Sequence, residues 1–191
     1  GESTVNFIIT TLLSQLPGNV GSAAQPLVER LKPTDNLLIA QTGTTLNEAV
    51  QIRIVAAAGI QAGQPIPNIA LRVRTENQDP ALGPVAVCDG EGDVALTDSS
   101  GVGTCNLKVG GRLGLAGLNV NIGGTQSLGG SSINLEVRAG PPAVLRILQG
   151  NNQSGNPGQR LPVAFLVQVE DASGNILPGQ AVNWEAVTPN S

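Results

Sequence analysis

The sequence predicts an all-β protein, and three of its properties support this prediction. The chain contains 25 Gly and 13 Pro among 191 residues, which indicates many turns and short elements. Aromatic residues make up only 2% of the chain, so the core must consist mainly of Val, Ile, Leu and Ala, a composition that suits pleated surfaces. Apolar and polar residues also alternate in many short segments, as in strands with one buried face.

Seven such segments lie between about residues 47 and 139, separated by turns rich in Gly, Asp, Asn and Pro. Seven short strands with a turn every 8–12 residues or so predict an immunoglobulin-like β-sandwich. Leu107, Ile133 and Leu135 are expected in its core. The apolar positions of the seven segments are Val50, Ile52, Ile54; Ile69, Leu71, Val73; Val85, Val87; Val94, Leu96; Cys105, Leu107, Val109; Leu118, Val120, Ile122; and Ile133, Leu135, Val137.

The strand pattern then starts again, which predicts immunoglobulin-like modules in tandem. Residues 52–55 are followed by a Gly-Gln turn at 63–67 and a strand, and residues 145–148 are followed by a similar turn at 158–162 and a strand. The offset of about 93–96 residues indicates an internal repeat. The expected core residues of the second copy are Val167, Val169 and Trp184.

These patterns predict three parts: an N-terminal segment over 1–46, a complete sandwich over 47–140 and a partial second module over 141–191. The partial module has only three strands, which leaves an unpaired edge and an open core. Residues 1–46 are either the end of a preceding repeat or strands that complete the second module. A short helix is expected over 23–32 and a strand over 37–40.

Val5, Phe7 and Ile9 stand at alternate positions, as in a strand. They are therefore candidates for a donor strand that fills the open second module. Such completion could occur within one chain or between chains.

Cys88 and Cys105 are the only cysteines in the sequence. Two cysteines are too few for a disulfide scaffold or a zinc site. They form either one disulfide, which closes a loop of about 18 residues and stabilises by roughly 3 kcal/mol, or two buried thiols. The disulfide is the preferred interpretation, and it requires an oxidising compartment.

One acidic cluster is a candidate calcium site. Asp89, Glu91 and Asp93 alternate with two glycines, and carboxylates in a Gly-rich loop can supply the oxygen ligands that Ca²⁺ prefers. The pattern lacks the remainder of an EF-hand, so a solvated turn is the preferred interpretation. No other cofactor is expected.

The composition also argues against several classes of function. The sequence has no His, which removes the commonest general base, and it has no nucleotide-binding or hydrolase motif, so we expect no enzyme. With net charge −4 and no basic stripe, it is not expected to bind nucleic acid. No apolar run reaches the ~18 residues of a membrane span. Trp184 could stack on a sugar, but it shares a face with Val182 and Ala186, so a core position is preferred.

Residues 158–184 (GQRLPVAFLVQVEDASGNILPGQAVNW) resemble the bacterial immunoglobulin-like repeats of the group-1, invasin and intimin type. Residues 96–110 (LTDSSGVGTCNLKVG) resemble a strand pair of these repeats, and residues 137–141 resemble their inter-repeat junction. The resemblance covers about residues 47–191. The first copy departs from the pattern because it lacks the Gly-Asn turn and the Trp.

This resemblance implies secreted or surface-anchored bacterial proteins with spacer or adhesive roles. We therefore expect an extracellular structural or adhesive module, a stalk or filament subunit, at the cell surface. Its expected partners are other copies of itself or neighbouring immunoglobulin-like repeats, and a host or matrix surface ligand. The alternative is a carbohydrate- or protein-binding accessory module of a secreted enzyme.

Overall fold

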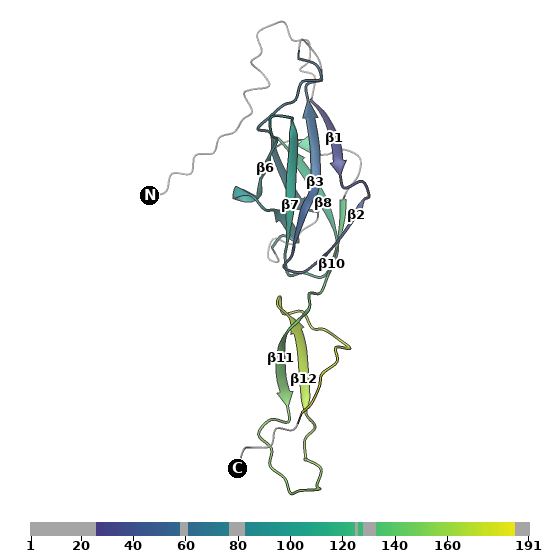
Figure 1. Ribbon diagram of the computed structural model, residues 1–191, viewed down its shortest axis with the longest axis vertical. Helices are drawn as coiled ribbons and strands as arrows, with labels where there is room; N and C mark the ends of the chain where they lie inside the picture. The colour runs from purple at the N-terminus through teal and green to yellow at the C-terminus, as the bar shows by residue number, and fades with distance from the viewer. Residues whose placement is uncertain (1–25, 58–60, 77–82, 125, 128–132, 186–191) are drawn as a thin grey trace, which may run out of the picture.

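The computed structural model describes residues 26–57, 61–76, 83–124, 126–127 and 133–185. In this part of the chain, every regular element is a β-strand except one turn of 3-10 helix, Glu91–Asp93. Two sheets enclose a common core, and a separate two-stranded sheet follows them along the long axis of the molecule (Figure 1). The prediction of an all-β protein is confirmed.

Each of the two sheets of the sandwich contains one strand from the start of the described chain. The first sheet is antiparallel, in the order β1 (Leu27–Lys32), β3 (Thr45–Val55), β7 (Val102–Val109) and β5 (Ala86–Cys88). The second runs in the order β2 (Leu37–Gln41), β10 (Ile133–Arg138), β8 (Gly114–Ile122), β4 (Ala70–Thr75) and β6 (Ala95–Leu96), with β9 (Gln126–Ser127) beside β8. Strand β2 is parallel to β10, and the other pairs are antiparallel.

The core lies between these sheets and follows the alternation of the sequence. In β3, for example, Val50, Ile52 and Ile54 are at most 1% exposed, whereas Arg53 between them is exposed. Leu107, Ile133 and Leu135, which were predicted in the core, are fully buried. Strands with apolar residues at every second position thus turn one face of each sheet inward.

The N-terminal boundary of the sandwich differs from the predicted one. Strand β1 pairs with β3, and β2 pairs with β10. Residues 26–46 therefore supply an edge strand to each sheet of the first sandwich, and they do not complete the second module. The helix expected over 23–32 is a strand over 27–32, because pairing with β3 outweighs local propensity. The candidate donor residues Val5, Phe7 and Ile9 lie outside the described residues.

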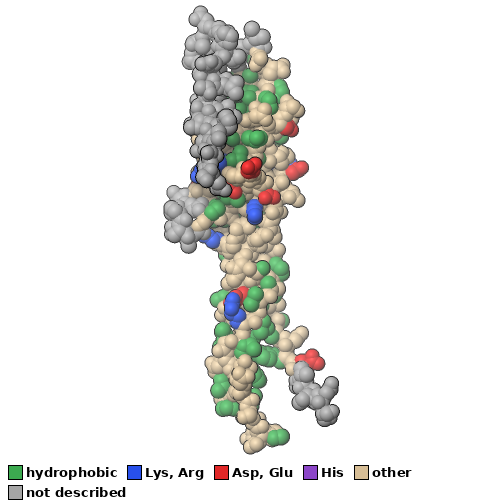
Figure 2. Space-filling model, turned by 90° about the vertical axis from the view of Figure 1, so that its left-hand side faces the viewer, with side chains coloured by type: hydrophobic (Ala, Val, Ile, Leu, Met, Phe, Trp, Pro, Cys, Tyr) green, Lys and Arg blue, Asp and Glu red, His purple; other side chains and the backbone are tan. Residues whose placement is uncertain are grey.

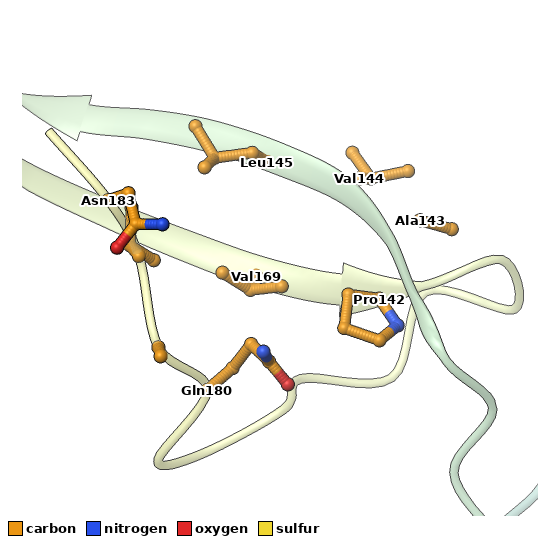
Figure 3. Close-up of a pocket in the computed structure, with 9 residues that line it drawn as sticks. Pro142, Ala143, Val144, Leu145, Val169, Gln180 and Asn183 are labelled. Carbon is orange, nitrogen blue, oxygen red and sulfur yellow. The ribbon is translucent and has the colours of Figure 1, made fainter. Parts of the chain in front are cut away.

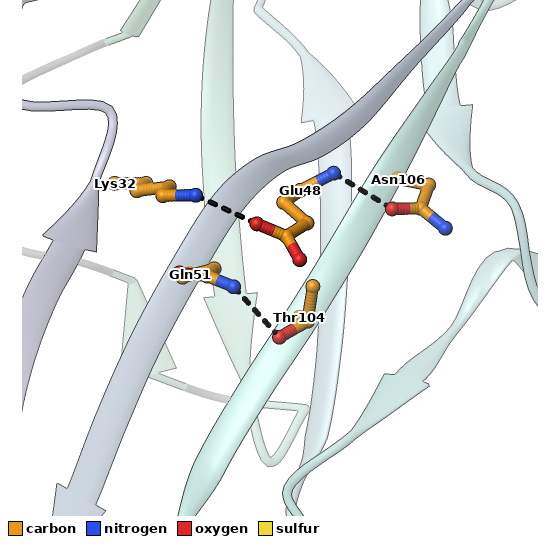
Figure 4. A network of polar contacts seen from close by, with 5 residues as sticks. All are labelled: Lys32, Glu48, Gln51, Thr104 and Asn106. Carbon is orange, nitrogen blue, oxygen red and sulfur yellow. Dashed lines mark hydrogen bonds and ion pairs between the residues drawn. The ribbon is translucent and has the colours of Figure 1, made fainter.

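A bulge in β3 is held by polar contacts with both neighbouring strands (Figure 4). The pairing of β3 with β7 shifts between Leu46 and Val50, and Glu48 lies in the left-handed region with φ 50°. The Glu48 N–H donates to Asn106 Oδ1 on β7 at 2.7 Å, and Lys32 at the end of β1 donates to the Glu48 carboxylate at 2.7 Å. The bond to Asn106 satisfies the Glu48 N–H where the bulge interrupts the ladder, and the ion pair with Lys32 ties the Glu48 side chain to β1.

The third sheet consists of β11 (Pro142–Gln149) and β12 (Leu166–Asp171), and we call it the hairpin. Leu145 pairs with Val169 in an antiparallel register, as Val28 of β1 pairs with Ile54 of β3. This pairing differs from the repeat predicted from the sequence, which aligned β11 with β3. The strands aligned with β11 and β12, β3 and β4, lie in different sheets, whereas β11 and β12 pair in one sheet. Residues 181–185 form no strand, in contrast to the prediction.

Candidate functional site at the junction

The hairpin meets the end of the sandwich at a small polar junction. Thr42 follows β2, Gly140 lies between β10 and β11, and Gly111 follows β7. Asp171 ends β12 and begins a turn that runs through Ser173 to Asn175. Four chain segments that are far apart in the sequence therefore converge on one point.

Asp171 first organises its own turn. Its Oδ1 accepts hydrogen bonds from the backbone N–H groups of Ser173 at 2.9 Å and Asn175 at 2.8 Å. The Gly174 N–H donates to the Asp171 carbonyl at 3.1 Å, and Gly174 has φ +83°, a conformation that glycine adopts without strain. The sequence Asp-Ala-Ser-Gly-Asn thus forms a hydrogen-bonded turn, because the Asp171 side chain accepts from backbone N–H groups in the place of a backbone carbonyl.

The second carboxylate oxygen of Asp171 reaches across to the sandwich. Its Oδ2 accepts from the Thr42 hydroxyl at 2.8 Å and from the Gly140 N–H at 3.0 Å. Asn175 adds a further link, because its Nδ2 donates to the Gly111 carbonyl at 3.0 Å and to Asp171 Oδ2 at 3.0 Å. The carboxylate therefore joins its own turn to two separate loops of the sandwich.

The centre of the junction is closed to solvent. Asp171 is 1% exposed and Thr42 is 8% exposed. Burial alone would raise the pKa of Asp171, but the hydrogen bonds from Asn175, Thr42 and Gly140 outweigh it and hold this pKa well below its ordinary value of 3.8. Asp171 is therefore a buried anion that is stabilised by hydrogen bonds.

Two glycines allow the parts to approach this closely. A Cβ added to Gly140 would lie 3.3 Å from Thr42 Oγ1, and a Cβ added to Gly111 would lie 3.2 Å from Ser173 Cβ. Both distances are tight for a carbon atom in a packed interface. Glycine at these two positions therefore lets the turn and the sandwich pack closely against each other.

The neighbouring carboxylate, Glu170, has partners within the hairpin. Its Oε1 accepts from Arg146 Nε at 2.7 Å and from Gln168 Nε2 at 2.8 Å, and these hydrogen bonds lower the pKa of Glu170. The side chain of Glu170 is 7% exposed, whereas that of Arg146 is 60% exposed. Arg146, Gln168 and Glu170 thus define a polar face of the hairpin.

The chemistry of the junction is that of a fixed joint. Both oxygens of Asp171 are engaged by donors of the protein, so the carboxylate is bound rather than presented to a substrate. What the arrangement can do is hold the hairpin in one orientation on the sandwich, because hydrogen bonds to a buried charge are stronger than those between neutral groups.

The predicted disulfide is confirmed. Cys88 and Cys105 are joined by an S–S bond of 2.10 Å, with their Cα atoms 5.2 Å apart, and both side chains are buried. Cys88 lies on β5 and Cys105 on β7, which are neighbouring strands of the same sheet. The bond therefore fastens the short strand β5 to the sheet rather than linking the two sheets.

The candidate calcium residues follow β5. Asp89, Glu91 and Asp93 are all exposed, and the last two lie in the 3-10 turn. Among the residues that the structure describes, no three His, Cys, Asp or Glu side chains are grouped so that they could hold a metal ion. The Gly92 carbonyl in this loop accepts from Arg72 Nη2 at 3.2 Å, so the loop is linked to β4.

The residues predicted in the second core are not enclosed. Val167 and Val169 are half-buried, and Trp184 is 61% exposed. The Trp184 ring lies 5.4 Å from that of Phe165, which is itself exposed. The interpretation of Trp184 as a core residue is wrong for this structure, because no second sheet covers the hairpin among the described residues.

Thr42 and Gly140 were missed as functional residues by sequence reasoning. The turn from Asp171 to Asn175 was recognised, but nothing local in the sequence connects it with a threonine 129 positions away. The sequence does carry a signal for the turn itself, because residues 98–101 repeat the Asp-x-Ser-Gly pattern of residues 171–174. Asp98 accepts hydrogen bonds from the Ser100 N–H at 2.9 Å and the Val102 N–H at 3.0 Å. The two turns therefore have the same pattern of internal hydrogen bonds.

Comparison of the chain with protein-family models, with curated proteins and with solved structures gives no match. None of the described segments forms a helix with the length and apolar character needed to cross a bilayer.

Proposed function

We propose that this chain is a structural, non-catalytic module of an extracellular bacterial surface or secreted protein, acting as a stalk or filament subunit. In this proposal, residues 26–140 form an immunoglobulin-like sandwich and the hairpin forms the start of a second one. The work of the chain is mechanical: it holds neighbouring parts at a fixed distance and in a fixed direction.

The strand order supports the immunoglobulin-like assignment. Immunoglobulin constant-type domains have strands A, B, E and D in one sheet and C, F and G in the other. The order β1-β3-β7-β5 matches the first sheet, and β4-β8-β10 matches the second. Here β2 adds a parallel strand beside β10, so that the start of the chain contributes to both sheets.

The observation that carries the proposal is the hydrogen-bonded joint around Asp171. A flexible linker would leave a hairpin free to swing, whereas Asp171 bonds simultaneously to Thr42 and Gly140 of the sandwich. The sandwich and the hairpin lie end to end (Figure 1), which is the arrangement that a spacer needs. The buried disulfide supports an oxidising, extracellular location, because such bonds persist there.

The test is whether the joint is stiff in solution. Amide ¹⁵N relaxation should give the same rotational correlation time for β12 and for the sandwich in the native chain. Thr42→Val removes the hydroxyl that links Asp171 and Gly140, and it should let the hairpin tumble independently. The matched control is Thr44→Val, since the one described hydrogen bond of Thr44 Oγ1 is to the Gln41 carbonyl at 2.7 Å, within its own turn. Independent tumbling in the native chain would exclude a stiff spacer.

One observation favours the alternative, a carbohydrate- or protein-binding accessory module. Trp184 and Phe165 are 61% and 53% exposed, and their rings are inclined at 30°. Exposed aromatic rings can stack on sugars. This alternative predicts that oligosaccharides change the emission of Trp184, which is the only Trp of the chain, and a glycan panel without any effect would count against it.

A further inference from the structure

The hairpin exposes an apolar face that none of the described segments covers. Leu145 is 52% exposed, Ile147 is 57% exposed and Phe165 is 53% exposed. Apolar side chains lie at the surface of the part of the molecule that contains the hairpin (Figure 2). A two-stranded sheet is marginally stable on its own in water, and a contiguous apolar patch marks an interaction site. We define the apolar face as Leu145, Ile147, Phe165, Val167, Val169 and Trp184.

A groove of about 310 Å³ lies on the hairpin (Figure 3). One wall consists of β11 and Val169, and the other consists of the segment from Gln180 to Asn183. Its lining is largely aliphatic, with Val144, Leu145 and Val182 among its residues. A groove of this kind accepts aliphatic side chains better than charged ones.

The sandwich shows what covers the same unit elsewhere in this chain. Strands β1 and β3 pair as β11 and β12 do, and their apolar residues Val28, Ile52 and Ile54 pack in a core with residues of the opposite sheet. The cover is thus the opposite sheet, whose strands carry apolar residues at alternate positions. A segment that covers the apolar face of the hairpin is expected to have the same alternating pattern and few charges.

The sequence contains such a segment outside the described residues. Residues 3–25 carry no charged side chain, and Val5, Phe7 and Ile9 alternate within them. We propose that residues 3–13 of a second copy of this chain bind as a strand to the apolar face of the hairpin. This inference rests on the filament form of the proposed function and names its partner.

The place where the described chain begins favours a second copy over the same molecule. Leu27 at the start of β1 pairs with Val55, whereas the hairpin joins the sandwich beside Thr42, near the opposite end of β3. The 11 residues of β3 place these two ends about 33 Å apart. The described chain therefore begins at one end of the molecule and the apolar face lies at the other. A segment that precedes residue 26 and binds the face of a second copy gives a heterologous arrangement, which builds open filaments.

Light scattering over a concentration series tests the proposal on the full chain. The mass of the native chain should rise beyond that of a dimer as concentration increases. Phe7→Asp should keep the chain monomeric, and its control Asn6→Asp adds the same charge at the alternate position. Leu145→Asp should also prevent assembly. Its control is Leu166→Asp, because Leu166 is 49% exposed but lies on the polar face with Gln168.

Mixing the variants distinguishes this arrangement from a symmetric dimer. Chains with Phe7→Asp retain the apolar face, and chains with Leu145→Asp retain the donor segment, so an equimolar mixture should give heterodimers and nothing larger. A synthetic peptide of residues 3–13 should dissolve native assemblies and change the emission of Trp184. Circular dichroism confirms that each variant is folded.

Three outcomes would overturn the proposal. The first is a native chain that stays monomeric at every concentration, and the second is assembly that survives Phe7→Asp. The third is a monomer in which Phe7→Asp changes the emission of Trp184, which would mean that the segment folds onto its own hairpin. None of these outcomes alters the relaxation test of the joint, so the failure of the two proposals can be distinguished.

Discussion

Thr42 Oγ1 and Asp171 Oδ2 lie 2.8 Å apart, although 129 positions separate the two residues in the sequence. Neither residue is more than 8% exposed, and the donors that surround the carboxylate are a hydroxyl, an amide and backbone N–H groups. Among the described residues, no Lys or Arg pairs with this buried charge. Salt screens exposed charge pairs far more than buried hydrogen bonds, so a joint of this kind keeps its stiffness over a wide range of ionic strength.

The joint should also resist moderate acid. The pKa of Asp171 is lowered from 3.8 in the folded chain, so the carboxylate stabilises the joint at any pH above 3.8 and loses this effect only as the pH falls through the lower, folded value. We expect the tumbling of β12 and of the sandwich to stay coupled from pH 8 to about pH 5 and to separate only in strong acid. Relaxation measurements over a pH series check this.

The control for the acid experiment is Asp98. Its carboxylate makes the same bonds within a turn but makes no bond to the hairpin among the described contacts. Asp171→Asn should weaken the joint at neutral pH, whereas Asp98→Asn should leave the coupling intact. A joint that loosens near pH 6 in the native chain would contradict the role given to Asp171.

Two glycines with similar backbone conformations should respond differently to a methyl group. Gly92 has φ +64° with nothing within 4 Å of an added Cβ, whereas Gly101 has φ +75° and its Cβ would lie 2.5 Å from the Ile54 carbonyl oxygen. Gly92→Ala should lower the free energy of unfolding by about 1–2 kcal/mol, the cost of the left-handed conformation. Gly101→Ala should cost about 1–3 kcal/mol more, because the chain is overpacked there.

Urea unfolding measures both glycine variants. The Ile54 N–H also donates to the Gly101 carbonyl at 2.9 Å, so the backbone at this point cannot move aside without losing a bond between β3 and the turn before β7. Equal losses of stability in the two variants would show that the close approach at Gly101 is relieved at no cost.

The disulfide should contribute to the stability of the sandwich. Cys88 and Cys105 close a loop with a sequence separation of 17, and a loop of that size stabilises by about 3 kcal/mol when it is crosslinked. The double variant Cys88→Ala, Cys105→Ala should therefore unfold at lower urea concentration. Reductant should lower the stability of the native chain by a comparable amount and leave the double variant unchanged. If the disulfide of the native chain is reduced and the urea concentration of unfolding does not fall, the prediction is contradicted.

The core of the sandwich could be predicted from the sequence because burial follows strict alternation there. Val50, Ile52 and Ile54 have no competing pattern, and the prediction placed the two cysteines in the same strands that the structure joins. The sequence of β1, Leu-Val-Glu-Arg-Leu-Lys, is different. Its apolar residues fit one face of a helix as well as a strand, and only pairing with β3 decides between them.

The junction and the second core depend on contacts that no local pattern encodes. Trp184 alternates with Val182 as in a strand, but burial also requires an opposing sheet, and no described segment covers that ring. Nothing in the sequence distinguishes Thr42 from other turn residues, because only the fold brings its partner Asp171 close to it. Similarly, the repeat of 93–96 residues rested on similar residues in β11 and β3, whereas β3 lies between β1 and β7 in a four-stranded sheet and β11 pairs with β12 in a two-stranded one.

The corrected boundary of the sandwich predicts which fragments fold. Ala40 of β2 is 6% exposed, and Val28 of β1 packs against the core. A fragment of residues 26–140 contains both strands and should unfold in one cooperative thermal transition. A fragment of residues 47–140, the predicted module, lacks an edge strand of each sheet, which bares the hydrogen-bonding edges of β3 and β10.

We therefore expect the shorter fragment to melt at a markedly lower temperature or to aggregate. Circular dichroism during heating and light scattering at low temperature compare the two fragments directly. The matched control is a fragment of residues 26–191, which adds the hairpin and should melt no lower than the fragment 26–140. Equal melting temperatures for the fragments 26–140 and 47–140 would mean that β1 and β2 lie on the sandwich without stabilising it, and the boundary predicted from the sequence would be the better description.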